Sequence, residues 1–181
     1  TNNIKNAIKL LSYVENGQSF SHKRAYQISN DEYKKDSNNL LNLYILASSS
    51  LSLGKLKESK DIWEKIILNI NYFPKEYISD INLGYAKALY LTEDYTRAYQ
   101  IVTNYEKFLY ETNDLSNLLI ALKICFEAKD FNSVHFFFNK MMQFSKTGDE
   151  LLPAIPQLLI SYYFMKNEIS GRTISKIIHQ L

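Results

Sequence analysis

The sequence predicts an all-α protein, and three observations point to this fold class. Only five Gly and three Pro occur in 181 residues, too few for the many tight turns of a β-sandwich, a barrel or a dinucleotide-binding fold. Apolar residues recur at three- and four-residue steps, which is the spacing of an amphipathic helix. One pattern of helix, polar turn and helix also returns along the chain. Together these features predict stacked helical hairpins without a sheet.

Composition limits the size of the fold and what can stabilise it. A chain of 181 residues that is 46% apolar and 22% charged suits one compact domain or one short repeat array, so we expect a single helical-repeat domain over 1–181. The single Cys125 can form neither an intramolecular disulfide nor a zinc site by itself. The core must therefore consist of packed apolar side chains.

Apolar periodicity and turn residues predict ten helices. Asp114 is the expected N-cap of one helix, because its carboxylate can accept the free amides of the first turn. Pro156 should delay or bend the start of another, and Pro74 should close a loop, since the residue before a proline avoids helical geometry. The predicted helices are Asn3–Glu15, His22–Lys35, Asn38–Leu53, Leu56–Ile70, Lys75–Leu91, Tyr95–Glu111, Leu115–Ala128, Phe131–Ser145, Pro153–Lys166 and Ile169–Leu181.

A repeated hairpin organises these helices. Aligning Leu56, Tyr95 and Phe131 superposes three turn residues and then three buried positions, which are Gly54, Glu93 and Lys129, followed by Ser59, Ala98 and Val134. Weaker copies precede them around Ala25 and follow them around Ile169. Each hairpin buries only one of its sides, so neighbours must stack to complete the core. The alignment predicts five hairpins, at 1–36, 37–74, 75–113, 114–148 and 149–181.

This pattern resembles the tetratricopeptide repeat (TPR), whose unit is a pair of antiparallel helices with a period near 34 residues. The residues that carry the resemblance are Ala47, Gly54, Leu56 and Ser59 in one unit, Ala86, Asp94, Tyr95 and Ala98 in the next, and Asp130, Phe131 and Val134 in the third. Two features depart from the family pattern. Leu122 replaces the family's small residue in the third unit, and Pro74 is the only proline that closes a unit.

The resemblance implies a concave groove lined by the first helix of each hairpin. By alignment, the partner-binding residues would be Tyr44, Ser48, Leu51, Leu83, Lys87, Tyr90, Leu119, Lys123 and Phe126. Such a groove could hold an extended segment or a partner helix; the alternative is that other helices cover this face. We call the three groove residues that one hairpin contributes a rung of the groove. Lys87 and Lys123 would lie on adjacent rungs, where an acidic residue or C-terminal carboxylate of the partner would complement them.

The sequence offers no catalytic, metal-binding or cofactor-binding constellation. His22, His135 and His179 belong to different hairpins, and no two histidines have the four-residue spacing that lets one helix face hold a metal. Five scattered glycines do not build a phosphate-binding loop. We expect Cys125 to be a buried structural thiol and His135 to be a packed or partly exposed imidazole, neither of them a ligand or nucleophile. We therefore expect a protein that is not an enzyme and uses no cofactor.

Charge and hydropathy suggest which partners are unsuitable. A net charge of +2 without a dense basic face disfavours nucleic acid as a partner.

The longest uncharged stretches, 37–54 and 151–165, are too polar or too short to insert into a membrane. No signal peptide is visible, although a start at Thr1 without Met leaves a lost leader open. We expect a cytoplasmic protein, with a periplasmic location or a soluble part of a larger protein as alternatives.

The function implied by the resemblance is a non-catalytic protein–protein interaction module, acting as an adaptor, assembly factor or chaperone. Some family members clamp the acidic tails of heat-shock proteins with Lys and Asn, but only Asn82 matches here. The corresponding positions elsewhere are Ser48, Leu43 and Leu118. Abundant Asn, Lys, Ile and Tyr are typical of AT-rich bacterial genomes. The alternative function is a peptide-sensing regulatory repeat domain of a bacterial transcription regulator or phosphatase.

Overall fold

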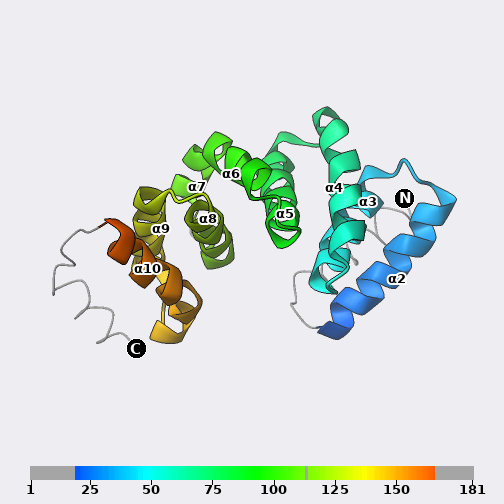
Figure 1. Cartoon of the computed structure of the whole chain (residues 1–181). Coiled ribbons are helices and arrows are strands. Elements are labelled where there is room, and N and C mark those ends of the chain that lie inside the picture. The colour runs from blue at the N-terminus through cyan, green and yellow to red at the C-terminus, as the bar shows by residue number, and fades with distance from the viewer. Residues whose placement is uncertain (1–18, 113, 166–181) are drawn as a thin grey trace. The chain divides into compact units, whose positions relative to one another are not determined.

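The computed structural model describes residues 19–112 and 114–165, and all regular structure in these ranges is helical, with no strand (Figure 1). The all-α fold class is thereby confirmed for the described residues. The chain divides into two compact units, unit 1 over 1–94 and unit 2 over 95–181. Their boundary falls inside the predicted hairpin 75–113. The predicted helices Asn3–Glu15 and Ile169–Leu181 lie outside the described residues.

In unit 1, successive helices pack against one another. Helix α3 contacts both α2 and α4, and α5 contacts α4 and α3. The elements are α2 (Ser19–Lys35), α3 (Leu40–Ser52), α4 (Leu56–Leu68), the short 3-10 helices η1 (Ile70–Tyr72) and η2 (Lys75–Tyr77), and α5 (Ile78–Leu91). The core is filled by the apolar stripes of these helices, including Ala25, Ile45, Leu46, Trp63, Ile66, Ile81 and Leu89.

Helices α4 and α5 approach closely at one point. The Trp63 side chain is 1% exposed and lies against the backbone of Gly84. A Cβ atom at Gly84 would lie 2.6 Å from Cζ2 of Trp63. Glycine is therefore required here because it leaves room for the indole ring.

In unit 2, α8 is the central helix. It contacts α6, α7, α9 and α10, and α10 also packs on α9. The elements are α6 (Tyr95–Asn104), α7 (Glu106–Glu111), α8 (Leu115–Glu127), α9 (Phe131–Phe144), η3 (Gly148–Glu150), η4 (Leu152–Ala154) and α10 (Ile155–Met165). The buried side chains include Ala98, Val102, Leu109, Leu118, Leu122, Phe137, Phe138 and Met141. Asp114 caps α8 as predicted, since its carboxylate accepts from the amides of Ser116 and Asn117.

The three turn residues that the sequence aligns share one backbone geometry. Their φ angles are left-handed, at +73° for Gly54, +64° for Glu93 and +61° for Lys129. In each turn the amide of the next residue donates to the carbonyl five residues earlier, at 2.9 Å; the pairs are Lys55 to Ser50, Asp94 to Leu89 and Asp130 to Cys125. This is the Schellman ending of a helix. The aligned small or apolar residues Ser59, Ala98 and Val134 are all fully buried.

Several predicted helix ends differ from the structure by one to three residues, including the start of α2 at Ser19 instead of His22, and one predicted helix is divided. The predicted helix Tyr95–Glu111 is two helices, because the chain leaves helical geometry at Tyr105 (φ −109°, ψ 17°). The predicted start at Lys75 is a 3-10 turn, and α5 begins only at Ile78. The predicted end at Ile70 is likewise 3-10, since α4 ends at Leu68. At the predicted helix start at Pro153, the chain forms a 3-10 turn and α10 begins only at Ile155, which confirms the delay expected from Pro156.

Candidate functional site

The first three predicted groove residues lie on α3. The ring of Tyr44 is half-buried, meets the Trp63 ring edge-on at 5.6 Å between centroids, and packs against the core pair Ala25 and Ile45. Tyr44 is therefore held rigidly by the core of unit 1. Ser48 and Leu51 are half-buried one and two turns further along the helix.

The next three predicted groove residues lie on α5, which contacts α3. Leu83 is only 3% exposed and belongs to the core. Lys87 is exposed and Tyr90 is half-buried. Unit 1 thus places two rungs of the predicted groove on neighbouring helices, with Lys87 as the exposed charge of the second rung.

The last three predicted groove residues lie on α8 in unit 2. Leu119 and Lys123 are half-buried. The ring of Phe126 packs on Phe131 of α9 at 6.2 Å, and Phe131 stacks on Phe164 of α10 at 5.8 Å and 8°. The aromatic end of this rung is therefore part of a stack that joins three helices. The placement of Lys87 and Lys123 on adjacent rungs stays a prediction.

A polar contact that sequence analysis did not anticipate joins the second helix of one hairpin to the turn of the next. Tyr26 accepts from Lys55 Nζ at 2.6 Å and donates to Glu58 Oε1 at 2.9 Å. Lys60 Nζ lies 3.6 Å from Asp94 Oδ2. Tyr99 donates to Asp130 Oδ2 at 3.0 Å. We call these three contacts the inter-hairpin contacts.

The inter-hairpin contacts recur at equivalent positions. Tyr26, Lys60 and Tyr99 each follow an aligned buried residue, and Lys55, Asp94 and Asp130 each follow a left-handed turn residue. Burial and the hydrogen bond to Asp130 raise the pKa of Tyr99 to about 12, so this hydroxyl remains a donor at neutral pH. The alignment itself was the signal that could have revealed these pairs.

Two hollows on unit 1 were also missed, because their walls come from separate segments. The first, of about 590 Å³, lies where α2 ends, α3 begins and α4 ends; its lining is Tyr33, Ser37, Asn38, Leu40, Leu43, Lys65, Asn69 and Tyr72. The second, of about 520 Å³, lies between α2 and α4; its lining is Asn30, Tyr33, Leu46, Lys57, Glu58, Asp61, Ile62 and Lys65. Tyr33 and Lys65 line both hollows.

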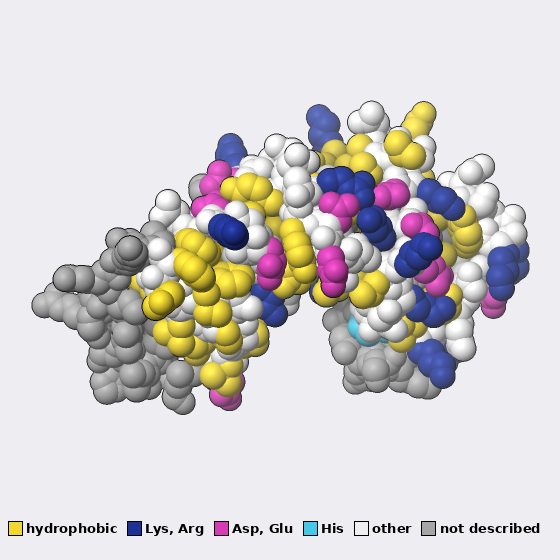
Figure 2. Space-filling model, viewed as in Figure 1, with side chains coloured by type: hydrophobic (Ala, Val, Ile, Leu, Met, Phe, Trp, Pro, Cys, Tyr) yellow, Lys and Arg dark blue, Asp and Glu magenta, His cyan; other side chains and the backbone are white. Residues whose placement is uncertain are grey.

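An exposed apolar surface lies on α10 in unit 2. Hydrophobic side chains gather around α9 and α10 (Figure 2), and the most exposed of them on α10 are Leu159, Ile160, Tyr163 and Phe164. Exposed patches of this kind mark interaction surfaces. None of these four residues belongs to the predicted groove.

The candidate reactive side chains are packed. Cys125 is 1% exposed, and burial, with the nearby charges of Asp130 and Glu106, raises the pKa of its thiol to about 12. The Nε2 atom of His135 lies 2.8 Å from Ser161 Oγ and its ring lies 4.0 Å from that of Tyr162. Burial lowers the pKa of His135.

Metal-binding clusters and membrane-spanning helices are both absent from the described part of the chain. Residues 19–112 and 114–165 contain no group of three or more His, Cys, Asp or Glu side chains that could hold a metal ion. None of the helices within those ranges has the length and apolar character needed to cross a bilayer. His179 lies outside the described residues.

No protein-family model, curated protein or solved structure matches this chain.

Proposed function

We propose that this chain is a non-catalytic protein–protein interaction module, a TPR-like solenoid of five hairpins that holds a partner peptide or helix. The partner would bind the surface formed by the first helix of each hairpin, which we call the first-helix face. The observation that carries the proposal is the repetition of one turn geometry at Gly54, Glu93 and Lys129. An inter-hairpin contact accompanies each of these turns. The repetition of both the turn geometry and the inter-hairpin contact supports the stacking of equivalent hairpins, which is the architecture of helical-repeat binding scaffolds.

The chemistry of the first-helix face supports peptide binding. Exposed Lys87 lies one turn before half-buried Tyr90 on α5, and α3 beside it contributes Ser48 and Leu51. Aromatic and aliphatic side chains that are already held by a core give contact area at low entropic cost. A lysine beside them favours an acidic residue or a C-terminal carboxylate on the partner. Adaptor, assembly and chaperone roles in the cytoplasm all fit this surface.

Site-specific photo-crosslinking tests the proposal. A photoreactive residue would replace Ser48, Lys87 or Lys123 in turn, with matched controls at the exposed second-helix positions Asp61 and Asn132. We expect the three first-helix positions to crosslink to the same protein, identified by mass spectrometry. The two controls should give no crosslink to that protein.

The double variant Lys87→Glu with Lys123→Glu then tests the charge of the face. We expect several-fold weaker binding of the crosslinked partner with an unchanged melting temperature, because exposed charges contribute little to stability. Crosslinks at Asp61 or Asn132 alone, or unchanged affinity in the double variant, would contradict the first-helix assignment.

A further inference from the structure

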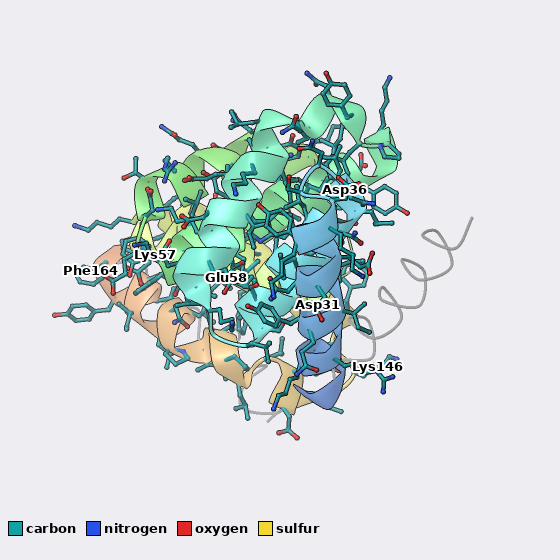
Figure 3. The ribbon with its side chains drawn as sticks, turned by 90° about the vertical axis from the view of Figure 1, so that its right-hand side faces the viewer. Asp31, Asp36, Lys57, Glu58, Lys146 and Phe164 are labelled. Carbon is teal, nitrogen blue, oxygen red and sulfur yellow. The ribbon has the colours of Figure 1, made fainter. Side chains whose placement is uncertain are left out.

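The first hollow of unit 1 is lined by both polar and apolar side chains. Its volume of about 590 Å³ falls within the range of about 300–1,000 Å³ found for small-molecule sites. Ser37 and Asn38, which line the hollow, directly follow Asp36 at the end of α2. Figure 3 shows Asp36 there, and Lys57 and Glu58 near the opposite end of α4. The hollow lies on different residues from the predicted groove.

The polar part of the lining carries one positive charge. Among the described residues that line this hollow, Lys65 is the only charged one, and it forms no ion pair with any side chain within 19–112 or 114–165. Its ammonium group donates to the Tyr33 hydroxyl at 3.0 Å. Three acidic residues, Glu32, Asp36 and Glu64, are direct neighbours of lining residues along the chain, but none of them is among the described residues that line the hollow. Glu32 pairs with Lys35 at 2.8 Å, Asp36 accepts from the backbone amide of Asn38 at 3.0 Å, and Glu64 accepts from the Tyr85 hydroxyl at 3.4 Å.

Lys65 and Tyr33 supply hydrogen-bond donors to this hollow. Because the Tyr33 oxygen accepts from Lys65, its own proton is directed elsewhere and can be donated to a ligand. Lys65 keeps further N–H donors, and Ser37, Asn38 and Asn69, whose side chains can both donate and accept, line the same hollow. A carboxylate accepts hydrogen bonds only, so it matches these donors and neutralises the lysine.

The lining also contains apolar side chains. Leu43 is 3% exposed, and Leu40 lies one turn earlier on α3. The ring of Tyr72 is 78% exposed at the rim, where it can cover an aliphatic or aromatic group. A ligand that fills this hollow must therefore carry an apolar group a few ångströms from its charge.

We propose that this hollow binds a small amphipathic carboxylate, with the charge held by Lys65 and Tyr33 and the apolar group held by Leu40, Leu43 and Tyr72. A single lysine without an arginine suits a monoanion better than a phosphate, which favours several charged donors. A free organic acid and the terminal residue of a peptide share this chemistry. The site does not depend on the first-helix face or on its partner.

Titration followed by amide NMR tests the site with three probes. N-acetyl-L-leucine represents a peptide terminus, 4-methylpentanoate represents a free acid, and N-acetyl-L-leucinamide removes the charge. We expect saturable shifts at Asn38, Leu40 and Asn69 with one or both acids and none with the amide. Tighter binding of N-acetyl-L-leucine would identify a peptide terminus as the source, and equal binding would identify a free acid.

Three variants assign the roles of the side chains. Lys65→Gln should weaken binding of the better acid about tenfold, as expected for loss of a hydrogen bond to a charged group. Tyr33→Phe keeps the ring and should weaken binding several-fold. Lys57→Gln, an equal charge change two turns away on α4, should leave binding unchanged. The amide spectrum of each variant verifies that the fold is retained.

Three results would overturn the proposal. The first is the absence of saturable shifts with either acid at concentrations up to about 50 mM, far above the millimolar Kd that corresponds to about 4 kcal/mol. The second is equal binding of the uncharged amide. The third is an equal loss of binding in Lys57→Gln and Lys65→Gln, which would indicate general attraction to a basic helix.

Discussion

At the scale of single residues, the contact between Trp63 and Gly84 sets the distance between two helices. We expect Gly84→Ala to destabilise the protein by about 1–3 kcal/mol, the usual cost of overpacking a core, because the added Cβ would lie 2.6 Å from the indole ring. Urea unfolding measures this cost. Trp63→Phe should reduce the penalty of Gly84→Ala in the double variant, and a penalty unaffected by Trp63→Phe would contradict the contact.

His135 should make stability depend on pH. Because burial lowers its pKa in the folded state, the unfolded chain binds more protons between the folded pKa and the ordinary value of about 6.5. The stabilising contribution of neutral His135 is therefore fully present above pH 6.5 and is lost as pH falls through the folded pKa. Urea unfolding at pH 7.5 and pH 5.5 should show a smaller pH dependence for His135→Gln than for the parent chain.

Sequence reasoning worked for residues whose environment follows from helix periodicity. Cys125 and His135 lie in apolar runs; the sequence predicts a buried thiol and a packed or partly exposed imidazole, and in the structure Cys125 is buried and His135 is half-buried. Gly84 was overlooked, because a glycine inside a helical pattern does not reveal which side chain approaches it. The alignment predicts that Leu83 lines the groove, yet its side chain packs in the core. Which residues of α5 face the core depends on the rotation of the helix about its own axis, and a repeat alignment does not specify that rotation.

At the scale of elements, the left-handed turn residues provide a matched set of variants. A residue with a Cβ strains this conformation by about 1–2 kcal/mol, whereas glycine adopts it freely. We expect Lys129→Gly and Glu93→Gly to stabilise the protein by about 0.5–1 kcal/mol each, after the larger entropy loss of glycine is subtracted.

The reverse change at Gly54 completes the set. A Cβ at Gly54 has no atom within 4 Å, so Gly54→Lys should cost about 1 kcal/mol from backbone strain alone. Thermal unfolding of the three variants measures these effects. Stabilisation by Gly54→Lys, or destabilisation by Lys129→Gly, would contradict the shared geometry of the turns.

Helices were easier to predict than their ends. The apolar stripes define α3, α4, α8 and α9 to within a few residues. The break at Tyr105 has neither proline nor glycine; its amide is shared between the carbonyls of Ile101 and Val102, at 3.1 and 3.2 Å. Such a break arises from packing of the flanking helices, and local sequence carries no sign of it.

At the scale of the whole molecule, the two compact units provide a test of cooperativity. Each unit has its own buried core, and Trp63, the only tryptophan, reports on unit 1. Phe138→Ala should destabilise unit 2 by about 3–5 kcal/mol. We expect helix loss followed by circular dichroism to shift to lower urea concentration, while the Trp63 fluorescence transition stays in place. Equal shifts of both signals would show that the chain unfolds as one cooperative unit.

The two hollows of unit 1 also depend on the arrangement of several helices and not on any single element. Each wall of the first hollow comes from a different helix end, and its charge is that of one lysine among 21 Lys and Arg residues. Periodicity identifies which face of a helix is buried, but a hollow depends on where three helix ends stop in space. The sequence therefore predicted hairpins and a groove by alignment, and it did not predict this site.

The inter-hairpin contacts also bear on the order in which hairpins follow one another. The three contacts use different chemistry at one position: a tyrosine with a lysine and a glutamate, a lysine with an aspartate, and a tyrosine with an aspartate. An exchanged hairpin that brought Lys60 to the turn of Lys55 would place two ammonium groups together and leave Asp94 without its cation. Repeated modules are prone to swapping between chains because their interfaces are alike. In this protein the chemistry of these contacts differs from one neighbour to the next, so exchanged hairpins would not reproduce them and we expect a chain with shuffled hairpins to assemble less readily.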